Sequence, residues 1–163
     1  AVRDDVAKSI KHIITASGST TPFLIENSAG QKGKLCSDLA EIRWLLDTVN
    51  EPTLGWCYDT CHGWAAGYSE TQKEGKRLFE ALEQFDLWDS LKCLHTNDSR
   101  DPFNSGRDRH ANFLKGTIPR EEWDAILGEK RLQHIPLITE VPGEDGEGPD
   151  KHNIDVLRSL AHA

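Results

Sequence analysis

The sequence predicts an α/β fold in which short parallel strands alternate with helices. Apolar runs of strand length are separated by segments whose apolar residues recur at helical spacing, and the two kinds of segment alternate strictly. One helix is followed by four strand–helix units, an order that implies a parallel sheet with helical crossovers. No linker or low-complexity segment divides the 163 residues, which suffice for one hydrophobic core.

The first half of the chain holds two of the predicted helices and two of the predicted strands. Apolar residues at helical spacing predict helices over 1–16 and 37–49, the second with Ser37 as its N-cap. The apolar runs 20–26 and 54–59 have the length and composition of strands.

The second half continues the alternation. Ser69 and Gln72 form a capping-box pair and predict the start of a helix with Leu78 on its buried face. The polar stretch 96–117 has no periodic pattern and is long for a connection, which indicates a functional loop. The other predicted elements are a strand at 91–95, a helix at 119–128, a strand at 134–141 and a terminal helix after 150.

Each of the four predicted strands ends on a carboxylate or an imidazole. These residues are Glu26, Asp59, His95 and Glu140. In parallel α/β folds the carboxyl ends of the strands are where active sites are built. A single strand-end carboxylate is commonly a helix cap, but four such residues in succession indicate a shared functional site.

Three further residues extend this set. His62 lies three positions after Asp59, and the Asp108–Arg–His110 segment places two donors on one side of an extended chain. The seven residues contain no thiolate, which favours zinc or manganese in a water-accessible catalytic site. Converging carboxylates without a cation would repel one another. A solvated acidic rim, the alternative, would not explain why histidines lie among them.

At these residues the sequence closely resembles the endonuclease IV family. The resemblance runs from the first helix to the last, and the segment that reads DTCH followed by AAGY is highly specific. It implies a TIM-type parallel (β/α) barrel, of which the domain at 1–163 holds the last four strand–helix units, the C-terminal half. The segments that carry it, in family order, are 25–31 (IENSAGQ), 59–68 (DTCHGWAAGY), 95–98 (HTND), 108–110 (DRH) and 135–140 (IPLITE).

The resemblance also implies a centre of three zinc ions. Glu26 would bridge the first and second ions, and the second would also be held by Asp59, His95 and Glu140. The third would be held by His62, Asp108 and His110. The family's other ligands for the first ion are two histidines on earlier strands that this chain does not contain, so two sites are complete here; Mn²⁺ is an alternative metal.

The implied reaction is hydrolysis of the phosphodiester bond 5′ to an abasic nucleotide in double-stranded DNA, a step of base excision repair. A metal-activated water would attack the phosphorus. Glu26 and Glu140 are the predicted catalytic residues, and Glu140 would orient that water. DNA contacts are predicted for four residues in the flanking loops: Asn97, Ser99, Arg107 and Arg109.

One stretch departs from the family pattern. Leu114 stands where the family usually has glycine, and Lys115 stands where it often has an acidic residue. A glycine at such a position marks a backbone conformation or a close approach that leucine resists. We therefore expect the loop after Asp108–His110 to differ in detail from its relatives.

Two other functions remain open at this point. Sugar isomerases and epimerases of the same superfamily present similar donors at these strand ends around one or two metals, but they have no use for His62, Asp108 and His110. A non-catalytic metal-binding remnant is the second alternative, because four of eight barrel units leave open sheet edges. We expect little or no nicking activity from this chain alone, and association with a missing N-terminal half or with itself.

Composition bounds the setting of the protein. The net charge of −8 argues against broad coating of DNA, although bound cations would cancel much of it at one face. Cys57 and Cys93 lie in apolar stretches, so we expect free thiols in an intracellular protein: bacterial cytoplasm, nucleus or mitochondrion. No run is long enough to span a membrane. The absence of methionine leads us to expect a fragment.

Overall fold

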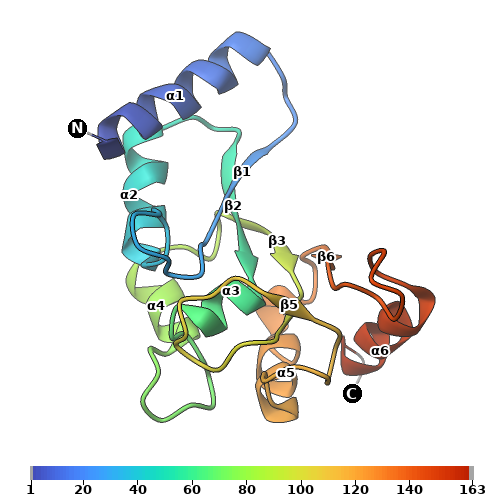
Figure 1. Cartoon of the computed structure of the whole chain (residues 1–163). Helices are drawn as coiled ribbons and strands as arrows, with labels where there is room; N and C mark the ends of the chain where they lie inside the picture. The colour runs from blue at the N-terminus through green and yellow to red at the C-terminus, as the bar shows by residue number, and fades with distance from the viewer. Residues whose placement is uncertain (1, 162–163) are drawn as a thin grey trace.

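The computed structural model describes residues 2–161, so Ala1 of the first predicted helix and residues 162–163 of the predicted domain lie outside it. Helices separate the four strands of the main sheet along the described chain (Figure 1). Their order is α1 (Val2–Ser17), β1 (Phe23–Glu26), α2 (Leu39–Val49), β2 (Leu54–Asp59), α3 (Thr60–Ala65), α4 (Leu78–Gln84), β3 (Leu91–His95), β4 (Asp98–Ser99), β5 (His110–Ala111), α5 (Arg120–Leu127), the 3₁₀ helix η1 (Lys130–Leu132), β6 (Leu137–Ile138) and α6 (Lys151–Ala161).

The main sheet is parallel and its strands lie in chain order, β1-β2-β3-β6. The predicted α/β class and the half barrel are therefore confirmed. The register matters for the site, because it places Glu26 beside Cys57, Cys57 beside Cys93, and Asp59 beside His95. Paired residues share a face of the sheet, so these side chains all lie on one side.

The opposite face of the sheet carries the hydrophobic core. Ile25, Trp56, Tyr58 and Leu94 are buried there together with the apolar faces of α1, α2 and α4. Because successive strand residues point to opposite faces, Trp56 and Tyr58 face the helices while Cys57 and Asp59 face the other way. A second core joins α5 to α6 around the fully buried Trp123.

Two predicted helix starts are wrong. The N-cap of α2 is Asp38, whose side chain accepts a hydrogen bond from the Ala40 amide, and Ser37 precedes it. Ser69 accepts from the Gln72 amide as expected, but this pair forms a turn, and α4 begins only at Leu78. The reason is tertiary: Ser69 also donates to the buried carboxylate of Glu122 on α5, which holds the turn away from the helix.

Other differences concern short elements. The helix α3 was not predicted because its six residues, TCHGWA, have no amphipathic period. The loop 96–117 contains the small antiparallel pair β4–β5, whose two-residue strands leave no pattern in the sequence. The strand predicted at 134–141 is regular only at Leu137–Ile138.

The sheet ends in two unpaired strands within the described residues. The edge strands are β1 and β6. Phe23 on one and Ile138 on the other are large apolar residues left exposed, Ile138 by 48%. Among residues 2–161 we find no helix long and apolar enough to cross a membrane.

Candidate metal centre

The structure brings all seven predicted donors together at the carboxyl ends of the strands. The first group surrounds the ring of His95, whose Nδ1 lies 3.3 Å from Oε1 of Glu26 and 3.5 Å from Oε2 of Glu140. Asp59 belongs to the same group, because its carboxylate, Glu26 and His95 each offer a donor atom within 4.8 Å of the others.

The second group lies beside the first and contains the donors that follow the strands. His62 Nε2 is 3.1 Å from Oδ1 of Asp108, and His110 Nε2 is 3.6 Å from the same oxygen. Asp59 joins the two groups, since its Oδ2 lies 3.7 Å from His110 Nε2. Asp59, His62 and His110 also form a compact set of three possible ligands. The two groups therefore share one fully buried carboxylate.

Local sequence explains how Asp59 and His62 are held. Asp59 ends β2 and is the N-cap of α3, accepting a 2.8 Å hydrogen bond on Oδ1 from the His62 amide. This cap places the His62 ring in the first turn of the helix, above the strand end. Gly63 follows because no side chain fits there: a Cβ atom at that position would lie 1.9 Å from the Tyr58 hydroxyl oxygen.

Two buried asparagines orient the donors. The side-chain oxygen of Asn27 accepts a hydrogen bond from the Asp59 amide at 2.6 Å. The backbone carbonyl oxygen of Asn27 lies 2.9 Å from Nδ1 of His62. In the neutral ring that contact favours the tautomer with a proton on Nδ1, which leaves the lone pair of Nε2, on the side of Asp108, free to bind a metal ion. Asn97 donates to Oδ2 of Asp59 at 2.7 Å and accepts from the Glu140 amide at 2.7 Å.

Electrostatics make the cluster a site for positive charge. Burial raises the pKa of Asp59, despite the nearby imidazoles of His62 and His110. Burial acts to lower the pKa of His62, but its hydrogen bond to Glu26 and the charges of Asp59, Asp108 and Glu26 outweigh this effect and raise the pKa to about 9. Burial also acts to raise the pKa of Glu26, and here contacts with His62 and His95 leave it lowered. The carboxylates thus hold a proton on His62 where no other cation balances them.

The donor set fits divalent cations. Nδ1 of His95 and Nε2 of His110 are buried and have no hydrogen-bond partner among residues 2–161, although each faces two carboxylates. A buried polar atom without a partner costs free energy, and a metal ion between imidazole and carboxylate would satisfy it. The described residues therefore contain two adjacent candidate metal-binding groups built from oxygen and nitrogen donors.

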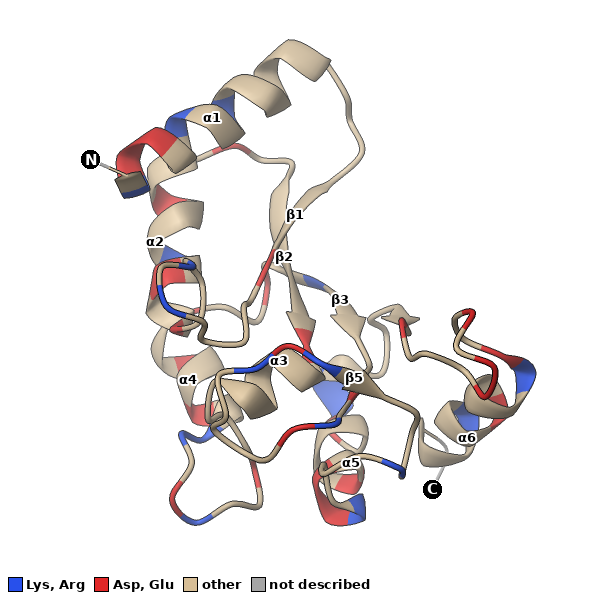
Figure 2. Cartoon of the chain, viewed as in Figure 1, with Lys and Arg blue, Asp and Glu red and all other residues tan. Residues whose placement is uncertain are grey.

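The four predicted DNA contacts divide into two pairs. Asn97 and Ser99 are fully buried and hydrogen-bonded within the chain, so their burial does not fit the predicted DNA contact. Arg107 and Arg109 are exposed in the loop that enters β5, where basic and acidic residues alternate (Figure 2). Both arginines lie within 4 Å of Asp101, and their side chains are more than half exposed.

Sequence reasoning missed Asn27 and Gly63 and gave Asn97 a different role. Asn27 comes directly after a strand-end glutamate, and Asn97 comes two residues after a strand-end histidine. An amide at such a position was a usable signal, because ligands at strand ends need hydrogen-bonding neighbours to orient them. Nothing in the local sequence indicates that Gly63 must make room for Tyr58.

The fold and the donor cluster together define a half barrel of the parallel β/α type with candidate metal-binding groups at its strand ends. The family model described as a xylose isomerase-like TIM barrel matches residues 1–160. The chain belongs to this family and, within it, to the endonuclease IV family.

Individual relatives agree. The probable endonuclease 4 of Sulfurihydrogenibium sp. (strain YO3AOP1) is 38% identical over 141 residues, covering 86% of this chain and 50% of that protein. The probable endonuclease 4 of Aquifex aeolicus (strain VF5) is 32% identical over 158 residues, covering 96% and 55%. The crystal structure of endonuclease IV from Thermus thermophilus superposes with a TM-score of 0.82 at 28% identity, covering 98% and 58%. The chain thus spans about half the length of these relatives.

Proposed function

We propose that this chain is the C-terminal half of a DNA-repair phosphodiesterase that cuts 5′ to abasic sites with a multinuclear zinc centre. The observation that carries the proposal is the convergence of seven donors, scattered from Glu26 to Glu140, into two adjacent groups that share Asp59. The relatives named endonuclease 4 support the same activity.

The ligand roles follow the two groups. Glu26, Asp59, His95 and Glu140 would hold one ion, with Glu26 also reaching toward a further ion. His62, Asp108 and His110 would hold the other ion, and Asp59 lies close enough to His110 to influence both. Bound zinc activates a water for attack and neutralises the negative charge that grows on a phosphoryl group.

The exposed residues of the site would handle the substrate. The Glu140 carboxylate is half exposed, and Asn97 anchors its backbone amide, so it lies in a fixed position at the mouth of the site. We assign it the orientation of the attacking water, and Glu26 the role of second catalytic carboxylate. Arg107 and Arg109 are placed to bind DNA backbone phosphates. An abasic nucleotide leaves the base stack at low cost, which favours damaged DNA as substrate.

The rest of the barrel would be needed for activity. The edge strands β1 and β6 lack partners within the described residues, and beside β6 there is an apolar hollow of about 660 Å³ lined by Leu94, Leu127, Leu137 and Leu157, among others. An N-terminal half or a second copy of the chain would cover these surfaces. We therefore expect the chain alone to bind zinc but to nick DNA weakly or not at all.

Zinc binding and strand cleavage test the proposal separately. Chelator competition should find about two zinc ions per chain, as two sites with three or more protein ligands each require, and Asp59→Asn should weaken both. A duplex with one abasic site should be nicked once the chain is joined to the N-terminal half of the Sulfurihydrogenibium relative, and Glu140→Gln should abolish that nicking. The undamaged duplex is the control.

Two results would overturn the assignment. Equal cutting of damaged and undamaged duplex by the joined protein would remove the abasic specificity. One Mn²⁺ per chain with aldose–ketose turnover would instead indicate a sugar isomerase of the same superfamily. The convergence of His62, Asp108 and His110 supports the nuclease, because an isomerase with one metal ion would not use these three residues as ligands.

A further inference from the structure

We infer that Cys57, Cys93 and His95 form a second kind of metal site, selective for thiophilic cations such as Cd²⁺ or Cu⁺, directly beneath the carboxylate groups. The three residues each offer a donor atom within 4.8 Å of the others. Neither thiol takes part in a disulfide, and the proposed phosphodiesterase mechanism uses neither.

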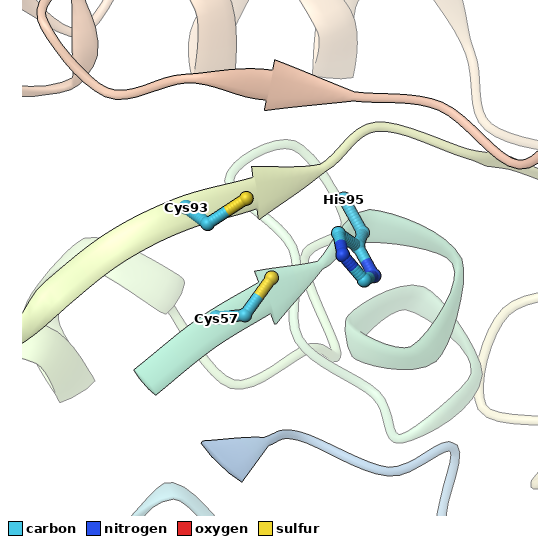
Figure 3. Close-up of side chains that lie close together, drawn as sticks. All are labelled: Cys57, Cys93 and His95. Atoms are coloured by element: carbon cyan, nitrogen blue, oxygen red, sulfur yellow. The ribbon is translucent and has the colours of Figure 1, made fainter. Parts of the chain in front are cut away.

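The placement follows from strand geometry. Cys57 and Cys93 are direct partners in the register of β2 and β3, and each lies two residues before a strand-end donor, Asp59 or His95. Residues two apart share a face, so the thiols lie one layer below the candidate metal centre on the same side of the sheet. Figure 3 shows both sulfur atoms directed toward the strand ends, where the His95 ring lies.

The spacing suits a metal ion. Sulfur ligands at about 2.3 Å from a tetrahedral ion stand roughly 3.7 Å apart. Donors already within 4.8 Å of each other need to close by only about 1 Å to reach that geometry. Both cysteines are buried, so an ion here is removed from water. On binding, each thiol releases its proton to solvent and becomes the thiolate ligand.

Ligand softness separates the two kinds of site. Thiolates favour soft cations, whereas carboxylates with imidazole favour zinc, manganese and other harder cations. His95 is common to both, because its Nδ1 also faces Glu26 and Glu140. A neutral imidazole has one lone pair to give. When an ion is held by the two thiolates and His95, that ring can therefore no longer serve as a ligand for an ion in the carboxylate group.

Cadmium titration of the 163-residue chain tests the site. In a phosphine reductant that keeps all thiols reduced, added Cd²⁺ should produce the ultraviolet thiolate-to-cadmium charge-transfer band, saturating at one ion per chain. Cys57→Ser and Cys93→Ser should each abolish the band. Cys36→Ser should keep it, because that buried thiol belongs to no candidate group among the described residues. His95→Gln should need more cadmium to reach saturation.

Glu140→Gln separates this inference from the proposed function. It removes a ligand of the carboxylate group only, so zinc binding there should weaken while the cadmium band stays unchanged. The inference is overturned if the wild-type chain shows no band although a thiol assay counts four reduced cysteines. It is also overturned if the band survives in both Cys57→Ser and Cys93→Ser. If the His95→Gln variant binds cadmium with wild-type affinity, His95 is not a ligand and the proposed three-residue site is wrong. Circular dichroism checks that each variant is folded.

Discussion

The two faces of the β1-β2-β3-β6 sheet differ in what they need to be complete. On the outer face, Trp56, Tyr58 and Leu94 pack against helices of the same chain, and Trp56 also donates to the Leu87 carbonyl oxygen at 2.9 Å. On the inner face, Asp59 and His95 lie among charged and imidazole side chains, and some buried ring nitrogens have no hydrogen-bond partner in the described part of the chain. The outer face is therefore covered largely by apolar packing within the chain, whereas the inner face carries candidate metal ligands.

This difference separates stability from function within the same strands. Neighbouring residues of β2 alternate between the two faces, so a substitution at position 56 acts on the core and one at position 59 acts on the site. We therefore expect stability to depend mainly on the helix-covered face, and the donor-lined face, where carboxylates crowd around imidazoles, to contribute mainly to the proposed metal binding. Three experiments test this division, and a fourth tests the loop at Leu114.

The largest effect is expected from Trp56→Ala on the outer face. Removing a fully buried indole and its hydrogen bond should lower the free energy of unfolding by about 3–5 kcal/mol. Urea unfolding in EDTA measures the loss. The matched inner-face variant, His95→Ala, should cost much less because Nδ1 of that ring has no hydrogen-bond partner within the described structure. Equal losses would contradict the division between the faces.

Asn97→Ala should weaken metal binding by about 10–100-fold, the usual cost of losing a residue that orients ligands. It removes the donor to Asp59 and the acceptor of the Glu140 amide. Zinc affinity is measured by chelator competition. Asn153→Ala is the control: this asparagine is equally buried, but it bonds to Asp150 and to the Phe113 amide. A similar loss of affinity in both variants would show only general destabilisation.

The metal-free chain should become less stable as the pH rises from 6.5 to about 9. His62 has a folded-state pKa of about 9 against an ordinary value of 6.5, so its contribution is complete below 6.5 and is lost as it deprotonates in the folded state. Urea midpoints in EDTA at several pH values measure this fall. His62→Gln should flatten it, while His12→Gln, at an exposed position outside the site, should leave it intact. Zinc affinity should rise over the same range, because His62 must lose its proton to bind.

The smallest effect concerns Leu114, which has a φ of 61° and stands where the resemblance to the endonuclease IV family led us to expect glycine. Leucine in this left-handed conformation raises the free energy of the folded state by about 1–2 kcal/mol. Glycine avoids this cost, but it loses more conformational entropy on folding, which cancels part of the gain. Leu114→Gly should therefore stabilise the chain by less than about 1 kcal/mol. Lys115→Gly, at a neighbour without positive φ, should destabilise it. Stabilisation by both glycines would show that loop strain at Leu114 is not the cause.

Much of the fold was predictable because it rests on local periodicity. The spacing of apolar and polar residues along the chain predicts the order of strands and helices, the parallel sheet and the donors at the strand ends. Elements without a period were missed, namely the six-residue α3 and the two-residue strands β4 and β5. The helix start predicted at Ser69 is wrong because the Ser69 hydroxyl donates a hydrogen bond to Glu122, a residue far away in the sequence.

The sequence by itself determined which residues carry possible metal-ligand atoms and at the end of which strand each one lies. The periodicity of the apolar residues and the order of the elements along the chain suffice for both. Only the tertiary structure decided that Asp59 lies between the two groups, that Asn97 is buried and bonded to Asp59, and that Cys57 and Cys93 are side by side below His95. The physical reason is that these relations depend on the register between strands and on the packing of loops over their ends. Both are set by contacts between residues far apart in the chain.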